Sequence, residues 1–153
     1  MDLRDLLDRD SVVVRGAGSK RQALQGVADL AARRFGADPE AVLEALVERE
    51  RSGSTGIGEG VAVPHARLPA LGRMRGVFLR LEHPVAFEAV DDKPVDLLFG
   101  LFAPRHADTE HLRALARVSR TLRRPELREA LRQARSPDAL YALLAQEPQS
   151  TAA

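Results

Sequence analysis

The sequence predicts an α/β fold: a single domain in which helices cover both faces of a mixed β-sheet. Two observations carry this prediction. Short runs rich in β-branched residues alternate with segments of helical periodicity, and residues 95–102 (VDLLFGLF) form an almost continuous apolar run, typical of a central strand covered on both faces. A chain of 153 residues fits one domain. We expect the domain to span residues 1–146 and a disordered tail to span residues 147–153.

The first predicted elements are a strand and a helix. Residues 11–15 contain three consecutive valines, which favour a strand. Ser19 is a candidate N-cap, and apolar residues recur after it at helical spacing as far as about residue 34. Gly36 is placed to end this helix.

A second helix and a glycine-rich segment follow. Asp38 and Pro39 form a helix start, in which a capping side chain precedes proline at the first helical position, and Gly53 closes the helix. Residues 53–68 (GSTGIGEGVAVPHARL) contain too much glycine for a helix, and they predict only a short strand around residues 61–63.

The remaining elements are two strands and three helices. The apolar runs at residues 76–81 and 95–102 predict the strands. The last third of the chain is helical: Asp108 or Thr109 caps a helix that ends near residue 122, and two more helices span residues 125–135 and 136–144.

Composition excludes several classes of function. The chain has no cysteine, so it contains neither disulfides nor cysteine-ligated metals. Its net charge of +1 gives no overall attraction to nucleic acid or to a membrane surface, and one tyrosine and five phenylalanines provide no platform for stacking bases. No apolar run is long enough to span a bilayer, and residues 1–10 lack the hydrophobic segment of a secretory signal. A cytoplasmic protein is expected.

His65 is the first candidate for chemistry. It follows a short predicted strand and Pro64, within a segment whose glycines allow several backbone N–H groups to surround an anion. Neutral imidazole is a nucleophile near pH 7, so His65 is either a phosphoryl acceptor or a loop histidine without chemistry. The residues predicted to bind the phosphate are Ser54, Thr55, Gly56, Gly58 and Gly60.

Two further residues are candidates for the same site. Arg49 shares a helical stripe with Val42 and Leu46, so its guanidinium either reaches solvent or binds an anion. If Asp108 caps its helix, His111 lies in the first turn, near the positive end of the helix dipole, which favours a phosphate. His111 is either a half-buried structural histidine or part of an anion site.

The remaining histidines, arginines and known sequence motifs give little evidence of another functional site. His83 precedes a proline and is predicted to lie in a loop, and His106 lies in a predicted solvated connection. A zinc site of His65, His106 and His111 is conceivable, but no carboxylate stands at metal-ligand spacing. The sequence contains no nucleotide-binding glycine loop and no hydrolase elbow. The arginines of the last third form a solvated surface or a docking face for an acidic partner.

The glycine-rich segment carries a family resemblance. Residues 58–66 (GEGVAVPHA) resemble the phosphorylation-site signature of phosphotransferase-system EIIA domains of the fructose/mannitol type (EIIA type 2). Residues 53–68 are most similar to the nitrogen-related branch (EIIA-Ntr, or PtsN), and the resemblance continues through residues 84–104 and 110–122, so that it covers nearly the whole chain. Ala66 stands where the nitrogen branch often has glycine, and the signature tolerates small residues there.

The resemblance implies roles for three residues. It implies that the phosphoryl group is carried on Nε2 of His65, and that His111, which is not itself phosphorylated, and Arg49 help to hold it. The implied donor is an HPr-like (NPr-like) phosphocarrier protein, and neither a metal nor another cofactor is needed, because transfer between histidines requires chiefly positioning.

Three interpretations of the output stay open. Nitrogen-related EIIA proteins regulate protein targets, such as potassium-transport components or sensor kinases, and the lack of an attached EIIB or EIIC segment favours this interpretation. The alternative is a sugar-specific EIIA that passes phosphate to a separate EIIB for fructose or mannitol uptake. The third is a binding module without a carrier role. The presence of all three candidate residues, His65, His111 and Arg49, argues against it.

Overall fold

The structure, a computed structural model, describes residues 2–146. The tail predicted over residues 147–153 lies outside the described residues. Two short 3₁₀-helices, η1 (Leu3–Asp5) and η2 (Arg9–Ser11), precede the first strand, and Leu3, Leu6 and Leu7 are buried against the core.

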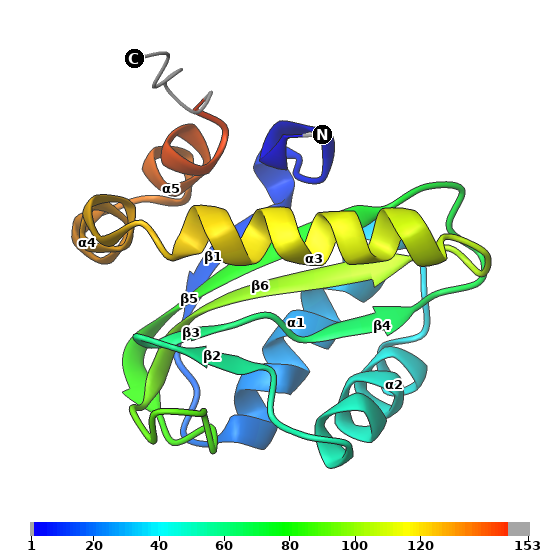
Figure 1. The fold of residues 1–153 in the computed structure, drawn as a ribbon, viewed down its shortest axis with the longest axis horizontal. Coiled ribbons are helices and arrows are strands. Elements are labelled where there is room, and N and C mark those ends of the chain that lie inside the picture. Colours follow the sequence, from blue (N-terminus) through cyan, green and yellow to red (C-terminus); the bar gives the residue numbers. More distant parts are fainter. Residues whose placement is uncertain (1, 147–153) are drawn as a thin grey trace.

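Six strands in the described part of the chain form one mixed sheet (Figure 1). The sheet order is β1-β5-β6-β3-β2, and β4 also pairs with β6. Strand β5 runs parallel to β1 and antiparallel to β6, whereas β3 and β4 both run parallel to β6. Their bounds are β1 (Val12–Arg15), β2 (Gly56–Gly58), β3 (Val61–Ala62), β4 (His65–Arg67), β5 (Arg75–Val85) and β6 (Val95–Ala103).

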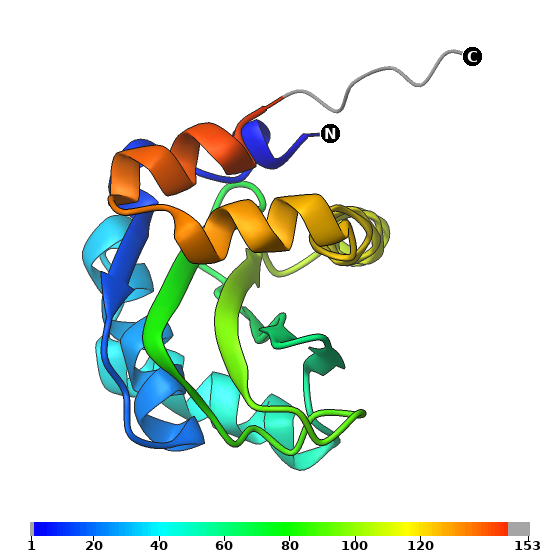
Figure 2. The same cartoon turned by 90° about the vertical axis from the view of Figure 1, so that its left-hand side faces the viewer.

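Helices cover both faces of this sheet, as the sequence predicts (Figure 2). One face carries α1 (Lys20–Phe35) and α2 (Pro39–Arg51). The other face carries the last three helices together with the N-terminal residues: α3 (Asp108–Leu122), α4 (Pro125–Gln133) and α5 (Pro137–Leu144). None of the helices within residues 2–146 has the length and apolar character needed to cross a membrane.

Strand β6 is the centre of the core. Its side chains alternate between the two faces: Leu97, Phe99 and Leu101 pack toward α3–α5, whereas Leu98 and Phe102 pack toward α1 and α2. All five are fully buried, so burial on both sides accounts for the lack of polar alternation in the sequence. The prediction of a central strand here is confirmed.

Four of the predicted helix boundaries are confirmed. Ser19, Asp38 and Ser136 each accept a hydrogen bond from the backbone N–H three residues later, as N-cap side chains do. Gly36 ends α1 in the left-handed conformation, with φ of 72°. These short-range contacts fix where α1, α2 and α5 begin and where α1 ends.

Strands β3 and β4 are consecutive segments along the same edge of β6. Residues 61–62 pair with 97–98, and residues 65–67 pair with 101–103. The ladder is interrupted at Val63 and Pro64, where proline has no N–H to donate, although the Pro64 carbonyl accepts from the Leu101 N–H at 2.9 Å. Figure 1 shows β4 between α3 and α2, and the first residue of β4, His65, contacts Arg49 of α2 and His111 of α3.

Two local predictions about strands need correction. The sequence did not predict β2 or β4, because strands of only three residues carry no readable periodicity. His83 was predicted in a loop, but β5 continues past it to Val85, which pairs with Val95 after an irregularity in the ladder. Pro84 is tolerated in this strand because it lies at that irregularity.

The start of α3 also differs from the prediction. Neither Asp108 nor Thr109 is the N-cap: Ala107 occupies that position, and its side chain makes no capping hydrogen bond. Asp108 is the first helical residue, and its carboxylate forms an ion pair with Arg67 of β4. An interaction across the fold therefore replaces the local cap, and it ties the start of α3 to the strand that carries His65.

Candidate active site

Three elements that are separate in sequence bring the predicted residues together. His65 begins β4, Arg49 lies in the last turn of α2, and His111 lies in the first turn of α3. The Arg49 Nε–H donates to Nε2 of His65 at 3.0 Å. The rings of His65 and His111 lie edge to face, with centroids 5.2 Å apart and planes at 81°.

The contacts of His65 define which nitrogen carries its proton. Nδ1 lies 3.0 Å from the Val63 carbonyl oxygen, which can only accept, so Nδ1 carries the hydrogen. A guanidinium can only donate, so the Nε2 atom that faces Arg49 presents its lone pair. The geometry therefore selects the tautomer in which Nε2 is the nucleophilic atom.

Arg49 is held in place by the end of its own helix. Its Nη1–H donates to the Gly53 carbonyl at 2.8 Å, while Nε–H reaches His65. Gly53 has φ of 142°, which glycine adopts without the penalty of a side chain. Within residues 2–146, no carboxylate lies at ion-pair distance from Arg49, so its positive charge faces a neutral ring without a compensating anion.

His111 contributes an unsatisfied nitrogen. Its side chain is half-buried, and its Nε2 atom is shielded from solvent without a hydrogen-bond partner among the described residues. A buried polar atom without a partner costs free energy, and in native proteins it calls for an explanation. A ligand oxygen between the two histidines would supply the missing partner.

Burial lowers the pKa of both histidines. For His65 the largest cause is desolvation; the hydrogen bond to Val63 opposes it, the charge of Arg49 adds to it, and Glu50 opposes it again. Desolvation also lowers the pKa of His111, helped by His65 and Arg67 and opposed by Asp108. Both rings are therefore predominantly neutral at pH 7, as a nitrogen nucleophile requires.

Ser54 and Thr55 make hydrogen bonds within the protein. The Ser54 hydroxyl donates to the Phe87 carbonyl at 2.9 Å and accepts from the Gly56 N–H at 3.1 Å. The Thr55 hydroxyl and N–H both donate to the carboxylate of Glu50, the latter at 3.0 Å. These contacts hold residues 54–56 to the rest of the fold, and a phosphate contact from them stays a prediction.

Gly58 and Gly60 lie elsewhere. Gly60 directly precedes Val61, which pairs with Leu97, whereas His65 pairs with Leu101. Val61 and His65 are thus about 13 Å apart along β6, and Gly60 lies one residue farther away. A Cβ on Gly60 would lie 2.3 Å from an Arg132 nitrogen, and one on Gly58 would lie 3.3 Å from the Asp91 carboxylate. The structure explains these two glycines by the close approach of other side chains, and it does not bring them to His65.

Sequence reasoning did not identify two groups that contact the site. One is the Val63 carbonyl, a backbone atom for which the sequence carries no signal. The other is Glu50. Its carboxylate accepts a hydrogen bond from the N–H of Thr55, two residues after Gly53, whose carbonyl binds Arg49. Its position next to Arg49 in the last helical turn was the available signal. Within residues 2–146, no three His, Asp or Glu side chains are grouped as metal ligands.

Comparison with known proteins gives a consistent picture. The profile of the family described as "Phosphoenolpyruvate-dependent sugar phosphotransferase system, EIIA 2" matches residues 5–147. The chain is 42% identical over 153 residues to a nitrogen regulatory protein of Bradyrhizobium diazoefficiens, covering 99% of this chain and 100% of that protein.

Solved structures show the same fold. The nitrogen regulatory protein IIA-Ntr of Neisseria meningitidis superposes with a TM-score of 0.86 at 34% identity, covering 93% of this chain and 98% of that one. The mannitol enzyme IIA of Escherichia coli, solved in complex with phosphorylated mannitol enzyme IIB, has a TM-score of 0.74 at 26% identity and covers 92% and 96% of the two chains.

Proposed function

Because the chain belongs to the EIIA type 2 family of the phosphoenolpyruvate-dependent sugar phosphotransferase system, we propose that it is a phosphocarrier that accepts a phosphoryl group on Nε2 of His65. One observation carries the proposal: Val63 binds Nδ1–H while Arg49 faces the Nε2 lone pair, each at 3.0 Å. The nucleophilic nitrogen therefore already points at the cation that a phosphoryl group requires.

The reaction moves a phosphoryl group between two imidazole nitrogens. The Nε2 lone pair forms the new N–P bond while the N–P bond of a phosphohistidine on an HPr-like carrier breaks, and the electron pair of the broken bond returns to the donor nitrogen. The proton on Nδ1 stays in place, so the phosphorylated ring is cationic and the Val63 carbonyl stabilises it. No further reactant is consumed.

Two side chains stabilise the charge on the phosphoryl oxygens. Arg49 exchanges its hydrogen bond with Nε2 for bonds to those oxygens, and Gly53 keeps the guanidinium in place during the exchange. His111 donates from its unsatisfied Nε2, which supplies the buried atom with its missing partner. Positioning and electrostatics suffice, because transfer between two imidazoles is nearly isoenergetic.

Intact mass spectrometry tests this proposal. The protein is incubated with phosphoenolpyruvate, enzyme I and an HPr-type carrier, next to His65→Ala and the exposed-histidine control His106→Ala. Parent and control should gain one phosphate that acid removes and base preserves, and His65→Ala should gain none. Acid-labile phosphate on folded His65→Ala would exclude His65 as the acceptor. His111→Ala should slow transfer yet leave His65 modifiable.

Similarity to known proteins supports a role for the phosphorylated protein. Full-length similarity to a nitrogen regulatory protein supports a regulatory role, in which the phosphorylation state changes binding to protein targets. A phosphoryl group adds up to two negative charges to the surface between α2 and α3, enough to alter recognition of a partner. The same proposal places the protein in the cytoplasm.

The second candidate is transfer to a sugar-specific EIIB. It is favoured by the likeness to mannitol enzyme IIA, whose solved complex contains phosphorylated enzyme IIB. Incubating the phosphorylated protein with EIIB proteins of the mannitol and fructose types separates the two outputs. Rapid loss of phosphate from His65 with a matching gain on EIIB would assign sugar uptake, and retention of phosphate supports regulation.

A further inference from the structure

Glu50 is a buried carboxylate that the reaction itself does not use. Its side chain is only 5% exposed, although it lies in the last turn of α2 next to Arg49. Burying a carboxylate costs several kcal/mol unless the charge is paired and hydrogen-bonded. A carboxylate at this position therefore needs partners, and the identity of those partners indicates its role.

The partners come from two directions. Lys20, the first residue of α1, forms an ion pair with Glu50 at 3.2 Å and lies over the ring of Phe87, 4.8 Å from its centroid. Thr55, itself buried, donates both its N–H and its hydroxyl to the Glu50 carboxylate. One carboxylate thus connects α1, α2 and the segment that leads into β2.

Hydrogen bonds continue from Thr55 to the candidate nucleophile. The Thr55 carbonyl accepts from the Val63 N–H at 2.9 Å, and the Val63 carbonyl accepts from Nδ1–H of His65 at 3.0 Å. Glu50 therefore reaches Nδ1 through two intervening residues, whereas its neighbour Arg49 contacts Nε2 directly. The last turn of α2 holds both nitrogens of the same ring.

We propose that Glu50 is a positioning residue for phosphoryl transfer: by fixing Thr55, and through it the Val63 carbonyl, it holds His65 in the tautomer that leaves Nε2 free to attack. This inference rests on the proposed function of His65. Its action is geometric, since the successive hydrogen bonds pass through different peptide groups and do not form one polarised chain. Without the carboxylate, the N–H and the hydroxyl of Thr55 lose their acceptors, and the Thr55 carbonyl that accepts from the Val63 N–H is held less firmly.

The test compares three variants. Glu50→Ala removes every contact, Glu50→Gln keeps the size of the side chain but removes its charge, and Glu48→Ala is the matched control. Glu48 is an exposed carboxylate on the same helix that pairs with the exposed Arg51. The rate constant of transfer at saturating phosphocarrier should fall about 100-fold in Glu50→Ala and less in Glu50→Gln, with little change in the half-saturating carrier concentration.

A second readout needs no phosphoryl donor. The ¹⁵N chemical shifts of His65 report the tautomer, and the Nδ1–H form should lose population in Glu50→Ala relative to the parent and to Glu48→Ala. Parent-like tautomer and rate in both Glu50 variants would overturn the inference. A shifted tautomer in a protein whose parent form is never phosphorylated would contradict the proposed function while leaving the positioning by Glu50 intact.

Thr55→Val keeps the inference testable if the Glu50 variants fail to fold. It removes the hydroxyl contact but keeps the backbone N–H and carbonyl contacts of residue 55. A smaller shift in the same direction, for both tautomer and rate, is expected, and Thr55→Ser should restore the parent values because it restores the hydroxyl. Parent-like values for folded Thr55→Val would count against the role of the network.

Discussion

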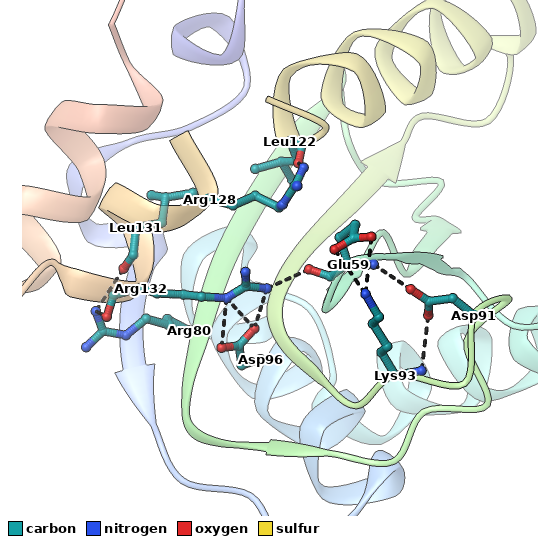
Figure 3. A network of polar contacts seen from close by, with 9 residues as sticks. All are labelled: Glu59, Arg80, Asp91, Lys93, Asp96, Leu122, Arg128, Leu131 and Arg132. Atoms are coloured by element: carbon teal, nitrogen blue, oxygen red, sulfur yellow. Dashed lines mark hydrogen bonds and ion pairs between the residues drawn. The ribbon is translucent and has the colours of Figure 1, made fainter. Parts of the chain in front are cut away.

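Two arginines in this molecule make similar contacts and differ in charge balance. Arg132 of α4 donates to the Asp96 carboxylate at 3.0–3.1 Å and to the Glu59 carbonyl (Figure 3). Arg49 likewise donates to the carbonyl of a loop residue, Gly53, but its second partner is a neutral imidazole. The guanidinium of Arg132 is paired with a carboxylate, whereas that of Arg49 has no carboxylate partner among residues 2–146.

The surroundings extend the contrast. Around Arg132, the Glu59 carboxylate pairs with Lys93 and the Glu59 N–H donates to Asp91, so each carboxylate there has a partner (Figure 3). Around Arg49, the nearby ring of His111 carries an unpartnered buried nitrogen. A complete network gains nothing from a further anion, whereas an incomplete one gains a great deal. What distinguishes the candidate site within residues 2–146 is therefore a combination: an arginine without a carboxylate partner lies beside a histidine ring whose neighbour His111 has an unpartnered nitrogen.

The largest expected effect on the transfer rate is that of Arg49→Lys. Lysine keeps the positive charge, but a single ammonium cannot reproduce the planar fork that contacts Gly53, His65 and an incoming phosphoryl group. We expect the transfer rate to fall about 100-fold or more, with a change in unfolding free energy below about 1 kcal/mol. Rapid-quench phosphorylation and urea denaturation measure the two quantities. A parent-like rate would remove Arg49 from the mechanism.

Gly60→Ala is expected to have the largest effect on stability. Gly60 has φ of +79°, and an added Cβ would lie 2.3 Å from Arg132 and 3.1 Å from Asp96. Backbone strain and displacement of the ion pair together should cost about 2–4 kcal/mol of unfolding free energy. Gly72→Ala, where nothing lies near the added atom, is the matched control. Much slower phosphorylation of folded Gly60→Ala would contradict the separation of the Arg132 region from the site around His65.

Arg132→Ala should have a smaller effect on stability. The pair with Asp96 is bidentate but partly exposed, with 32% and 18% of the side chains accessible, so solvent screening reduces its contribution. We expect a loss of about 1–2 kcal/mol by urea denaturation and a phosphorylation rate within about twofold of the parent. Arg123→Ala, at an exposed position, serves as the reference and should change neither quantity. A greatly slowed transfer in Arg132→Ala would show that the two regions are coupled.

The smallest expected effect is the dependence of the transfer rate and of stability on pH. Because burial lowers the pKa of His65 below its ordinary 6.5, the transfer rate should be flat from pH 7 to 8 and decline only below about 6.5. The pKa of His111 is lowered as well, so the unfolded chain binds more protons in this range. Stability should therefore fall as pH drops below 6.5, and the loss is complete below the two folded pKa values. His65→Asn should show a weaker fall in urea titrations at pH 7.5 and 5.5.

Most of the architecture can be predicted from local signals in the sequence. Capping side chains such as Ser19 and Asp38 act within one helical turn, and the unbroken apolar run of β6 reports burial on two faces, so both signals can be read locally. The glycine-rich signature around His65 identified the family, which the comparisons confirm. Local signals failed at the start of α3, because a contact between Asp108 and the distant Arg67 replaced the expected cap.

Tertiary structure alone decided how the site is built. The pairing of β4 with β6 and the packing of α2 and α3 beside it bring Arg49 and His111, which are 16 and 46 positions from His65, to the same ring. The same packing directs the Val63 carbonyl to Nδ1, buries Glu50 and carries Gly60 away toward Arg132. Sequence spacing records none of this, because such contacts depend on the register of strands and the approach of helices, which form only when the whole core closes.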